Sequence, residues 1–243
     1  LRYSSAGKIV YAAASIVVAL NKTTGKQSFL QAAHSDEVVS IGAHPNGQIF
    51  ASGDAGREPV IVIWSSIDMR VIARIEDSGH SSGIPLLAFN TQGNLLASTG
   101  MDSCNTLVLH DWTNNIEIMR TATDKGKIFC LAFLSNPTHS EESAIGGDDG
   151  DARGGKNVVD TVVTGGHKHL SFWYNNGNNV KTQHGIWGKY KPEAMETGPT
   201  ILSVVSPPNL PNVCITGSAV GAIVIWESYR AAFQAKKGHQ LRC

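Results

Sequence analysis

Two histidines and a lysine stand close together in the stretch GGHKHLSFWYNNG, which runs from Gly165 to Gly177. Imidazoles and amines are side chains that bind metal ions or transfer protons in active sites. A zinc site, however, needs three or four converging ligands, and neither a cysteine nor an acidic residue lies nearby in the sequence. We therefore expect no metal here, and place His167, Lys168 and His169 in a solvated turn between two strands.

Two other motifs come close to a ligand-binding pattern. Gly150 to Lys156, GDARGGK, fits the first part of a phosphate-binding loop, but Asn157 replaces the Ser or Thr that would bind magnesium. A calcium loop beginning at Asp149 would place Arg153 where a ligand oxygen is required. We interpret both motifs as parts of a surface loop and predict no cofactor and no catalytic residue.

Composition limits the classes of function. The 243-residue chain has 20 Lys+Arg and 20 Asp+Glu, so its formal net charge is zero. Proteins that bind nucleic acid or membrane surfaces usually carry a basic excess, so we expect neither partner. No apolar run reaches the roughly 18 residues of a membrane span, which indicates a cytoplasmic protein. The four cysteines are scattered, so neither disulfides nor a zinc knuckle is expected.

A repeat positions the polar residues. Four segments run from a β-favouring stretch through a Ser or Thr and a glycine turn to a second strand that ends near a large ring. Their hydroxyl residues are separated by 46, 66 and 52 residues and are Ser52, Ser98, Thr164 and Thr216. The long interval contains residues 136–157, a polar and Gly-rich stretch that we interpret as an inserted loop. Without it, the spacing approaches the roughly 40–45 residues of a four-stranded propeller blade.

Period-two alternation without a long helical window predicts an all-β chain, a β-propeller of about five blades. We place the blades at about residues 1–34, 35–80, 81–124, 125–198 and 199–243, with three strands between Ile9 and His34 in the first. Open sheets expose unpaired edges, so we expect an incomplete arc of a larger propeller, completed by more polypeptide or a neighbouring protein. The alternative is a closed five-bladed ring in which the tail QLRC pairs beside IVYAAAS.

The order of an apolar strand, a Ser/Thr-Gly turn, a strand ending in Trp, and Gly-His resembles the WD repeat. The stretches HSDEVVSIGAHPNGQIFASGD, VVTGGHKHLSFW and GIWGKY resemble the echinoderm microtubule-associated protein-like (EMAP-like) family more specifically. GKIVYAAASIVVALN resembles the tail of the hydrophobic motif that opens the first, N-terminal propeller of that family. The resemblance covers nearly the whole chain except the insert, and implies a WD40-type β-propeller that associates with tubulin or microtubules.

In WD repeats a His, a Ser or Thr, a Trp and an Asp form a buried hydrogen-bonded set within each blade. The resemblance implies partial sets here, in chain order: His34, Ser52, Asp54 and Trp64; His80, Ser98 and Asp102, with His110 at the Trp position; Thr164 and Trp173; Thr216 and Trp226. We expect these residues to hold the blades together rather than to catalyse, because a catalytic triad needs a single convergent geometry.

A propeller without a catalytic constellation is usually a binding platform, so we predict an interaction protein and not an enzyme. Tubulin is expected to be acidic, so the candidate contacts are basic residues at one end of the blades: Arg57, Lys125, Lys127 and Lys168. The alternative is that these are ordinary solubilising charges. The predicted location is the cytoplasmic cytoskeleton, on microtubules or in the cilium. An adaptor of another assembly, such as a ciliary or ubiquitin-ligase complex, and a nucleotide-handling enzyme remain open.

Overall fold

The computed structural model describes residues 1–123, 126–135, 160–175, 179–190 and 198–234. The expected inserted loop with its two ligand-like motifs, Lys125 and the tail QLRC lie outside these residues. In the described part the chain forms five four-stranded antiparallel sheets and one short 3-10 helix, Gly188–Tyr190. None of the helical structure in these ranges is long and apolar enough to cross a membrane.

Each sheet consists of four strands that are consecutive in the chain and pair in that order, so each is one blade. Blade 1 comprises β1 (Arg2–Tyr3), β2 (Lys8–Ala13), β3 (Ile16–Asn21) and β4 (Gln27–Leu30). Blade 2 comprises β5 (Val38–Ala43), β6 (Ile49–Asp54), β7 (Ile61–Ser65) and β8 (Val71–Ile75). Blade 3 comprises β9 (Leu86–Phe89), β10 (Leu95–Thr99), β11 (Leu107–Asp111) and β12 (Ile116–Thr121). Blade 4 comprises β13 (Ile128–Phe133), β14 (Val162–Gly166), β15 (His169–Asn175) and β16 (Val180–His184). Blade 5 comprises β17 (Ile201–Val205), β18 (Val213–Ser218), β19 (Ile223–Glu227) and β20 (Arg230–Gln234).

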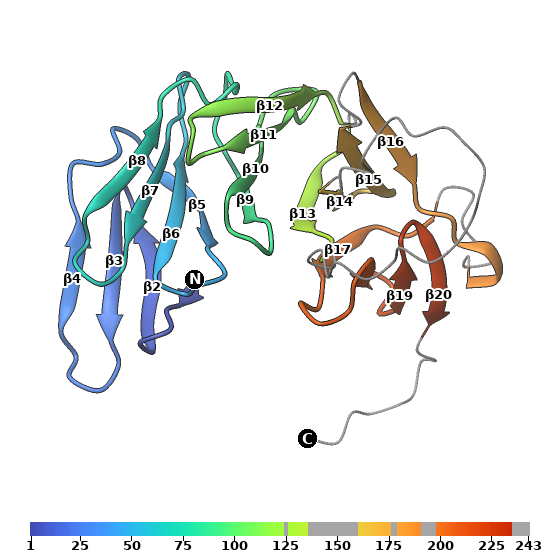
Figure 1. Cartoon of the computed structure of the whole chain (residues 1–243), viewed down its shortest axis with the longest axis horizontal. Helices are drawn as coiled ribbons and strands as arrows, with labels where there is room; N and C mark the ends of the chain where they lie inside the picture. The colour runs from blue at the N-terminus through green and yellow to red at the C-terminus, as the bar shows by residue number, and fades with distance from the viewer. Residues whose placement is uncertain (124–125, 136–159, 176–178, 191–197, 235–243) are drawn as a thin grey trace, which may run out of the picture.

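The blades follow one another around an arc, with blade 1 at one end and blade 5 at the other (Figure 1). The inner strands line the inside of the arc and pack in series: β1 and β2 against β5, β5 against β9, β9 against β13 and β13 against β17. The predicted all-β propeller with about five blades is therefore confirmed.

Packing between blades explains the hydrophobic pattern of the strands. All five residues of β10 and of β14 are buried, because a neighbouring sheet covers each face of their blades. In β19, at the end of the arc, buried Val224 and Trp226 alternate with more accessible residues. The apolar core accordingly lies in the seams between sheets, as where Trp64 of blade 2 packs with Val10 and Val17 of blade 1.

The three strands expected between Ile9 and His34 are present as β2, β3 and β4, but blade 1 has one more strand before them. A fourth strand, β1, pairs along the inner edge of β2, with Arg2 opposite Val10 and Tyr3 opposite Ile9. It occupies the edge at which the closed-ring alternative would place the tail. Two residues are too few to show a period-two pattern, so the sequence could not reveal this strand.

The four hydroxyl residues of the repeat occupy equivalent places in their sheets. Each lies on the second strand and pairs with the third strand at the same register: Ser52 opposite Val62, Ser98 opposite Val108, Thr164 opposite Ser171 and Thr216 opposite Val224. The turns between second and third strands and the connectors between blades meet at the same end of each blade, on one face of the arc, which we call the connector end. Backbone hydrogen bonds join them there, for example from Ala55 N to Glu37 O and from His167 N to Lys127 O.

Candidate functional site

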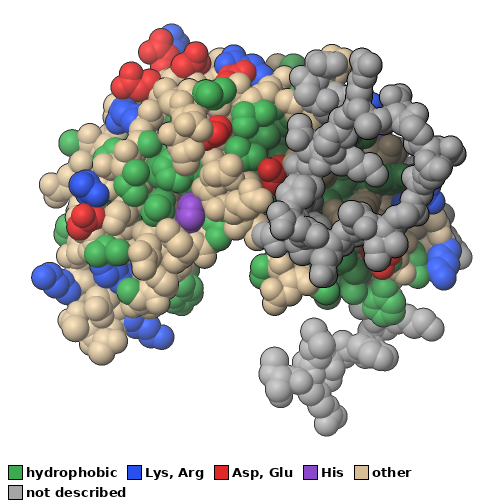
Figure 2. Space-filling view, viewed as in Figure 1, with side chains coloured by type: hydrophobic (Ala, Val, Ile, Leu, Met, Phe, Trp, Pro, Cys, Tyr) green, Lys and Arg blue, Asp and Glu red, His purple; other side chains and the backbone are tan. Residues whose placement is uncertain are grey.

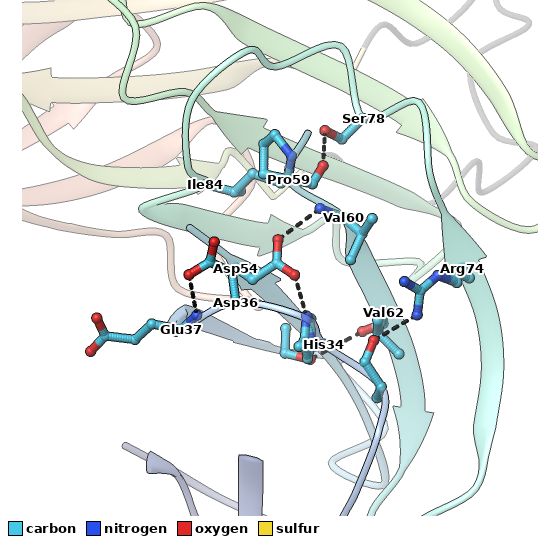
Figure 3. A network of polar contacts seen from close by, with 12 residues as sticks. His34, Asp36, Glu37, Asp54, Pro59, Val60, Val62, Arg74, Ser78 and Ile84 are labelled. Carbon is cyan, nitrogen blue, oxygen red and sulfur yellow. Dashed lines mark hydrogen bonds and ion pairs between the residues drawn. The ribbon is translucent and has the colours of Figure 1, made fainter. Parts of the chain in front are cut away.

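Blade 2 contains a continuous buried polar chain (Figure 3). His34, in the connector before β5, has its Nδ1 3.0 Å from Asp54 Oδ2 and its Nε2 2.7 Å from Ser52 Oγ. The backbone N–H of Val60 donates to the other carboxylate oxygen of Asp54 at 2.8 Å. These contacts join the connector, β6 and the turn before β7. Trp64 lies in the same blade, but its Nε1 has no hydrogen-bond partner among the described residues.

The proton positions in this chain follow from the acceptors. An ionised Asp54 can only accept, so Nδ1 of His34 donates to it and Nε2 accepts from the Ser52 hydroxyl. Burial lowers the pKa of His34, while Asp54 raises it in part. The arrangement has the order of a catalytic triad, but Ser52 is 0% exposed and Asp54 is 2% exposed. A hydroxyl that no substrate can reach does not act as a nucleophile, so in this structure the three residues link parts of one blade.

Blade 3 has a less complete set. His80 Nε2 lies 2.8 Å from Ser98 Oγ, but His80 Nδ1 has no partner in the described part. Asp102 does not bond to His80; its carboxylate instead accepts from Cys104 N and from the backbone and hydroxyl of Thr106, in its own turn. Burial lowers the pKa of His80 to about 4.

His110 stands where the other seams carry an indole. It is 2% exposed, its Nδ1 lacks a partner among the described residues, and burial lowers its pKa. A pocket of about 380 Å³ opens beside it, lined also by Arg74, Ile75, Glu76, Asp77, Asn115 and Glu117. Trp112, two residues on, donates instead to Gly93 O at 2.7 Å, so it does not replace the missing ring.

Blades 4 and 5 use an indole in place of the connector histidine. Trp173 Nε1 donates to Thr164 Oγ1 at 2.7 Å, and Trp226 Nε1 donates to Thr216 Oγ1 at 2.8 Å. The Thr164 hydroxyl also lies 2.7 Å from His169 Nε2. The expected solvated turn therefore holds only for His167 and Lys168, because His169 begins β15 and is 4% exposed. Side chains alternate between the two faces of a strand, and His169 lies on a buried face of β15. The sequence GGHKH does not show where the turn ends and the strand begins.

The described candidate basic contacts lie on two different blades. Lys127 and Lys168 are exposed at the connector end of blade 4, where the His167 N to Lys127 O bond joins their segments. Arg57 is also exposed, but lies on blade 2, in a segment that includes Glu58 and adjoins the connector of Asp36. Lys125 is outside the described residues.

Ligands for metals are not gathered in the described part. No group of three or more His, Cys, Asp or Glu side chains lies close enough there to hold a metal ion. Cys104, Cys130 and Cys214 are free thiols, and burial raises the pKa of both Cys130 and Cys214 to about 12. Buried thiols with such a pKa are poor nucleophiles.

Known proteins resemble the chain in sequence and in fold. Residues 25–65 match the family described as "WD domain, G-beta repeat". The chain is 27% identical to "Echinoderm microtubule-associated protein-like 4" of Xenopus laevis, across 96% of this chain and 23% of that protein. It is 27% identical to the "77 kDa echinoderm microtubule-associated protein" of Lytechinus variegatus, across 90% of this chain and 30% of that protein.

Two further similarities extend this picture. "Cilia- and flagella-associated protein 44" of Mus musculus is 25% identical across 71% of this chain and 8% of that protein. A chain in "Crystal Structure of Mitotic Checkpoint Complex" superposes with a TM-score of 0.66 and 17% identity, covering 98% of this chain and 63% of that chain. The present chain thus spans less than a third of each of these three sequence relatives. The chain has a WD40-type β-propeller fold, matches the WD repeat at residues 25–65, and is similar over most of its length to echinoderm microtubule-associated protein-like proteins.

Proposed function

We propose that the chain is a protein-interaction scaffold that binds tubulin or microtubules. The observation that carries this proposal is the similarity to microtubule-associated proteins across 90–96% of the chain. The architecture supports it, because stacked sheets form a rigid platform that presents turns for contact.

The described residues of blades 4 and 5 include basic side chains that could contact an acidic partner. In their described residues five side chains are cationic and two are acidic; the cations are Lys127, Lys168, Lys181, Lys189 and Arg230, and the acids are Asp160 and Glu227. The described part of blades 1 to 3, in contrast, has eight cations and ten acids. Over the full sequence, residues 124–243 have 12 Lys+Arg and 10 Asp+Glu, so in this proposal the attraction of an acidic partner is local to exposed cations and is not a property of both blades as a whole.

Lys127 and Lys168 are the contacts that we assign to this function. Both are exposed on neighbouring segments, and neither has a carboxylate within ion-pair distance in the described part. The arginines Arg70, Arg74 and Arg120 of blades 2 and 3 already pair with acids. We assign no role in microtubule binding to Arg57.

Further propeller, from the same polypeptide or a neighbouring protein, covers the two ends of the arc in this proposal. An apolar row crosses all four strands of blade 5 through the pairs Val205–Ile215, Ile215–Ile225 and Ile225–Phe233. Val205 is 57% exposed and Phe233 is 54% exposed. At the other end, Tyr3, Ile9 and Leu20 pair in a similar row, in which Tyr3 is 61% exposed. Apolar sheet faces of this kind are normally covered in soluble proteins.

A non-enzymatic role and a cytoskeletal location belong to the same proposal. The triad-like residues of blade 2 are buried, which argues against hydrolysis at Ser52. The similarity to a cilia- and flagella-associated protein favours a ciliary assembly as the second candidate function. In either case the location is the cytoplasmic cytoskeleton, on microtubules or in the cilium.

Sedimentation with polymerised tubulin tests the proposal. The purified chain is mixed with stabilised microtubules at low salt, pelleted, and compared with a sample without microtubules. The proposal predicts saturable pelleting that weakens as salt increases, because the attraction is between exposed charges. Absence of pelleting at low salt, together with specific recovery of a ciliary complex, favours the second candidate.

A further inference from the structure

Three inner strands carry the same irregularity. In β5 the pairing with β6 passes from Val38 to Ser40, so Val39 is an extra residue in a β-bulge. In β13 the pairing passes from Ile128 to Cys130, and in β17 from Ile201 to Ser203. The bulged residues there are Phe129 and Leu202. A bulge redirects the side chain of its extra residue, and such devices are common beside functional sites.

The bulged residues meet in one hollow on the inside of the arc. Val39, Phe129 and Leu202 all line a space of about 650 Å³ bordered by the inner strands of all five blades. In blade 3 it is bordered by Pro85, just before β9, which has no N–H to donate to a sheet. Figure 2 shows the arc indented between its two ends.

These side chains are more accessible than their strand neighbours. Leu202 is 52% exposed and Phe129 is 36% exposed, whereas the adjacent Ile201 and Ile128 are buried. Packing between the blades therefore does not depend on the side chains of Phe129 and Leu202. Large apolar groups exposed together in a concave site are typical of a pocket that receives a partner side chain.

The charges around the hollow favour a partner with a carboxylate. Its lining residues include Arg2 and no Asp or Glu. At its rim the ammonium group of Lys127 lies 5.9 Å from the centre of the Phe129 ring. An exposed cation beside an apolar anchor site matches a peptide in which an acidic residue stands close to a large apolar one.

We propose that this hollow is a docking site for a partner segment that inserts a large apolar side chain between Phe129 and Leu202 and places a carboxylate near Lys127. Val39 and Pro85 complete the apolar wall on the side of blades 2 and 3. The site goes beyond microtubule binding, because its anchors are apolar residues of the inner strands and not the exposed turns. Rigid strands on both sides preorganise it, which limits the entropy lost on binding.

A random 12-residue peptide library, displayed on phage and selected on the immobilised chain, tests the proposal. The expected enriched peptides contain an aromatic or large aliphatic residue with Asp or Glu within about three positions. Synthetic peptides from this set are then titrated by fluorescence anisotropy. Leu202→Ser and Phe129→Ser should each weaken binding at least about tenfold, the effect expected for an interface anchor. Lys127→Ala should weaken it less and reduce its salt dependence.

Matched control variants distinguish binding at this site from non-specific binding to exposed apolar side chains. Ile67→Ser and Ile116→Ser remove apolar side chains that are 66% and 55% exposed but do not line the hollow, so they should leave peptide binding unchanged. Thermal unfolding identifies any variant that has lost its fold, in which case the milder Leu202→Ala or Phe129→Ala replaces it. Leu202→Ser should still pellet with microtubules, so failure of this site is distinguishable from failure of the proposed function.

Any one of four results overturns the inference. One is a selection that enriches no peptide, and another is enrichment of peptides without the acidic and apolar pair. The third is binding that Phe129→Ser and Leu202→Ser leave intact. If instead the chain forms dimers that Leu202→Ser dissociates, the hollow is occupied by a second copy and the proposed partner is wrong.

Discussion

His110 lies directly opposite Leu96 in blade 3, at the register position where the neighbouring blades carry tryptophan. The equivalent pairs are Phe50–Trp64, Val162–Trp173 and Cys214–Trp226. All three indoles are at most 4% exposed and pack against the preceding blade. The seam between blades 2 and 3 is therefore the one described seam that has a smaller, polar ring and an adjoining pocket at this place.

An indole at position 110 should stabilise the packing between blades 2 and 3. His110→Trp fills part of the 380 Å³ pocket with apolar ring surface, and its one Nε1–H replaces two ring nitrogens, of which Nδ1 has no partner among the described residues. We expect a gain of about 1–2 kcal/mol in the free energy of unfolding, from added apolar burial. Urea unfolding at pH 7.5 measures it, with Trp64→His as the reverse change that should destabilise the seam between blades 1 and 2. A lower stability for His110→Trp would mean that the pocket cannot accept the ring.

Acidification should destabilise the protein through its buried histidines. The pKa of His80 falls from its ordinary 6.5 to about 4 on folding, so between these pH values the unfolded chain binds more protons than the folded one. The stabilising contribution is complete above pH 6.5 and is lost as the pH decreases towards 4. It amounts to about 3 kcal/mol at most. Urea unfolding at pH 7.5, 6 and 5 should show this decrease.

A variant assigns the pH dependence to His80. His80→Gln removes the titrating group and should flatten the decrease between pH 6.5 and 4, although it lowers stability at neutral pH. His110 and Arg120 oppose protonation of His80, while Asp102 and Glu117 favour it, so the salt concentration is held constant. The exposed His167 serves as control, and His167→Gln should retain the full slope. An unchanged slope in His80→Gln would assign the effect to other groups.

The hydroxyl of Thr164 should contribute more to the free energy of unfolding than the hydroxyl of Thr216. Thr164→Val leaves both Trp173 Nε1 and His169 Nε2 without this partner, whereas Thr216→Val removes the partner of Trp226 alone. Each substitution keeps the shape and should cost about 1–3 kcal/mol, with Thr164→Val the more costly. Thr164→Ser retains the hydroxyl and should recover most of the loss in thermal unfolding. Equal costs for the two Val variants would show that His169 gains little from Thr164.

The exposed faces at the ends of the arc should make the isolated chain self-associate. Phe233→Ser and Val205→Ser interrupt the apolar row on blade 5 and should lower the average mass measured by light scattering at high concentration. Ile116→Ser, on the outer strand of blade 3, is the control and should leave the mass unchanged. If the unsubstituted chain and all the variants stay monomeric at every concentration, these faces do not drive association.

The repeated positions could be predicted from the sequence because they follow a period. Ser52, Ser98, Thr164 and Thr216 recur with the glycine turns, and the structure places them at one register in four sheets. The same periodicity indicates which residues enter the seams. Propeller blades are local units of four consecutive strands, so sequence spacing directly reflects their geometry.

Other features depend on contacts that no spacing encodes. His169 could not be assigned to Thr164 because the end of the turn, and with it the face of the strand, is set by register. Phe129 and Leu202 look like ordinary strand residues until the pairing shows that each is the extra residue of a bulge. The placement of Asp102 on its own turn likewise reflects Thr106, which offers its carboxylate closer donors than His80.

Microtubule sedimentation of charge-reversal variants tests the central claim most directly. Lys127→Glu combined with Lys168→Glu places two acids on blade 4, and Arg57→Glu is the matched control on blade 2. Our account predicts that the unsubstituted chain and Arg57→Glu pellet with microtubules at low salt, while the double variant binds at least about tenfold more weakly. The account is contradicted if the unsubstituted chain stays in the supernatant, or if the double variant pellets as well as Arg57→Glu.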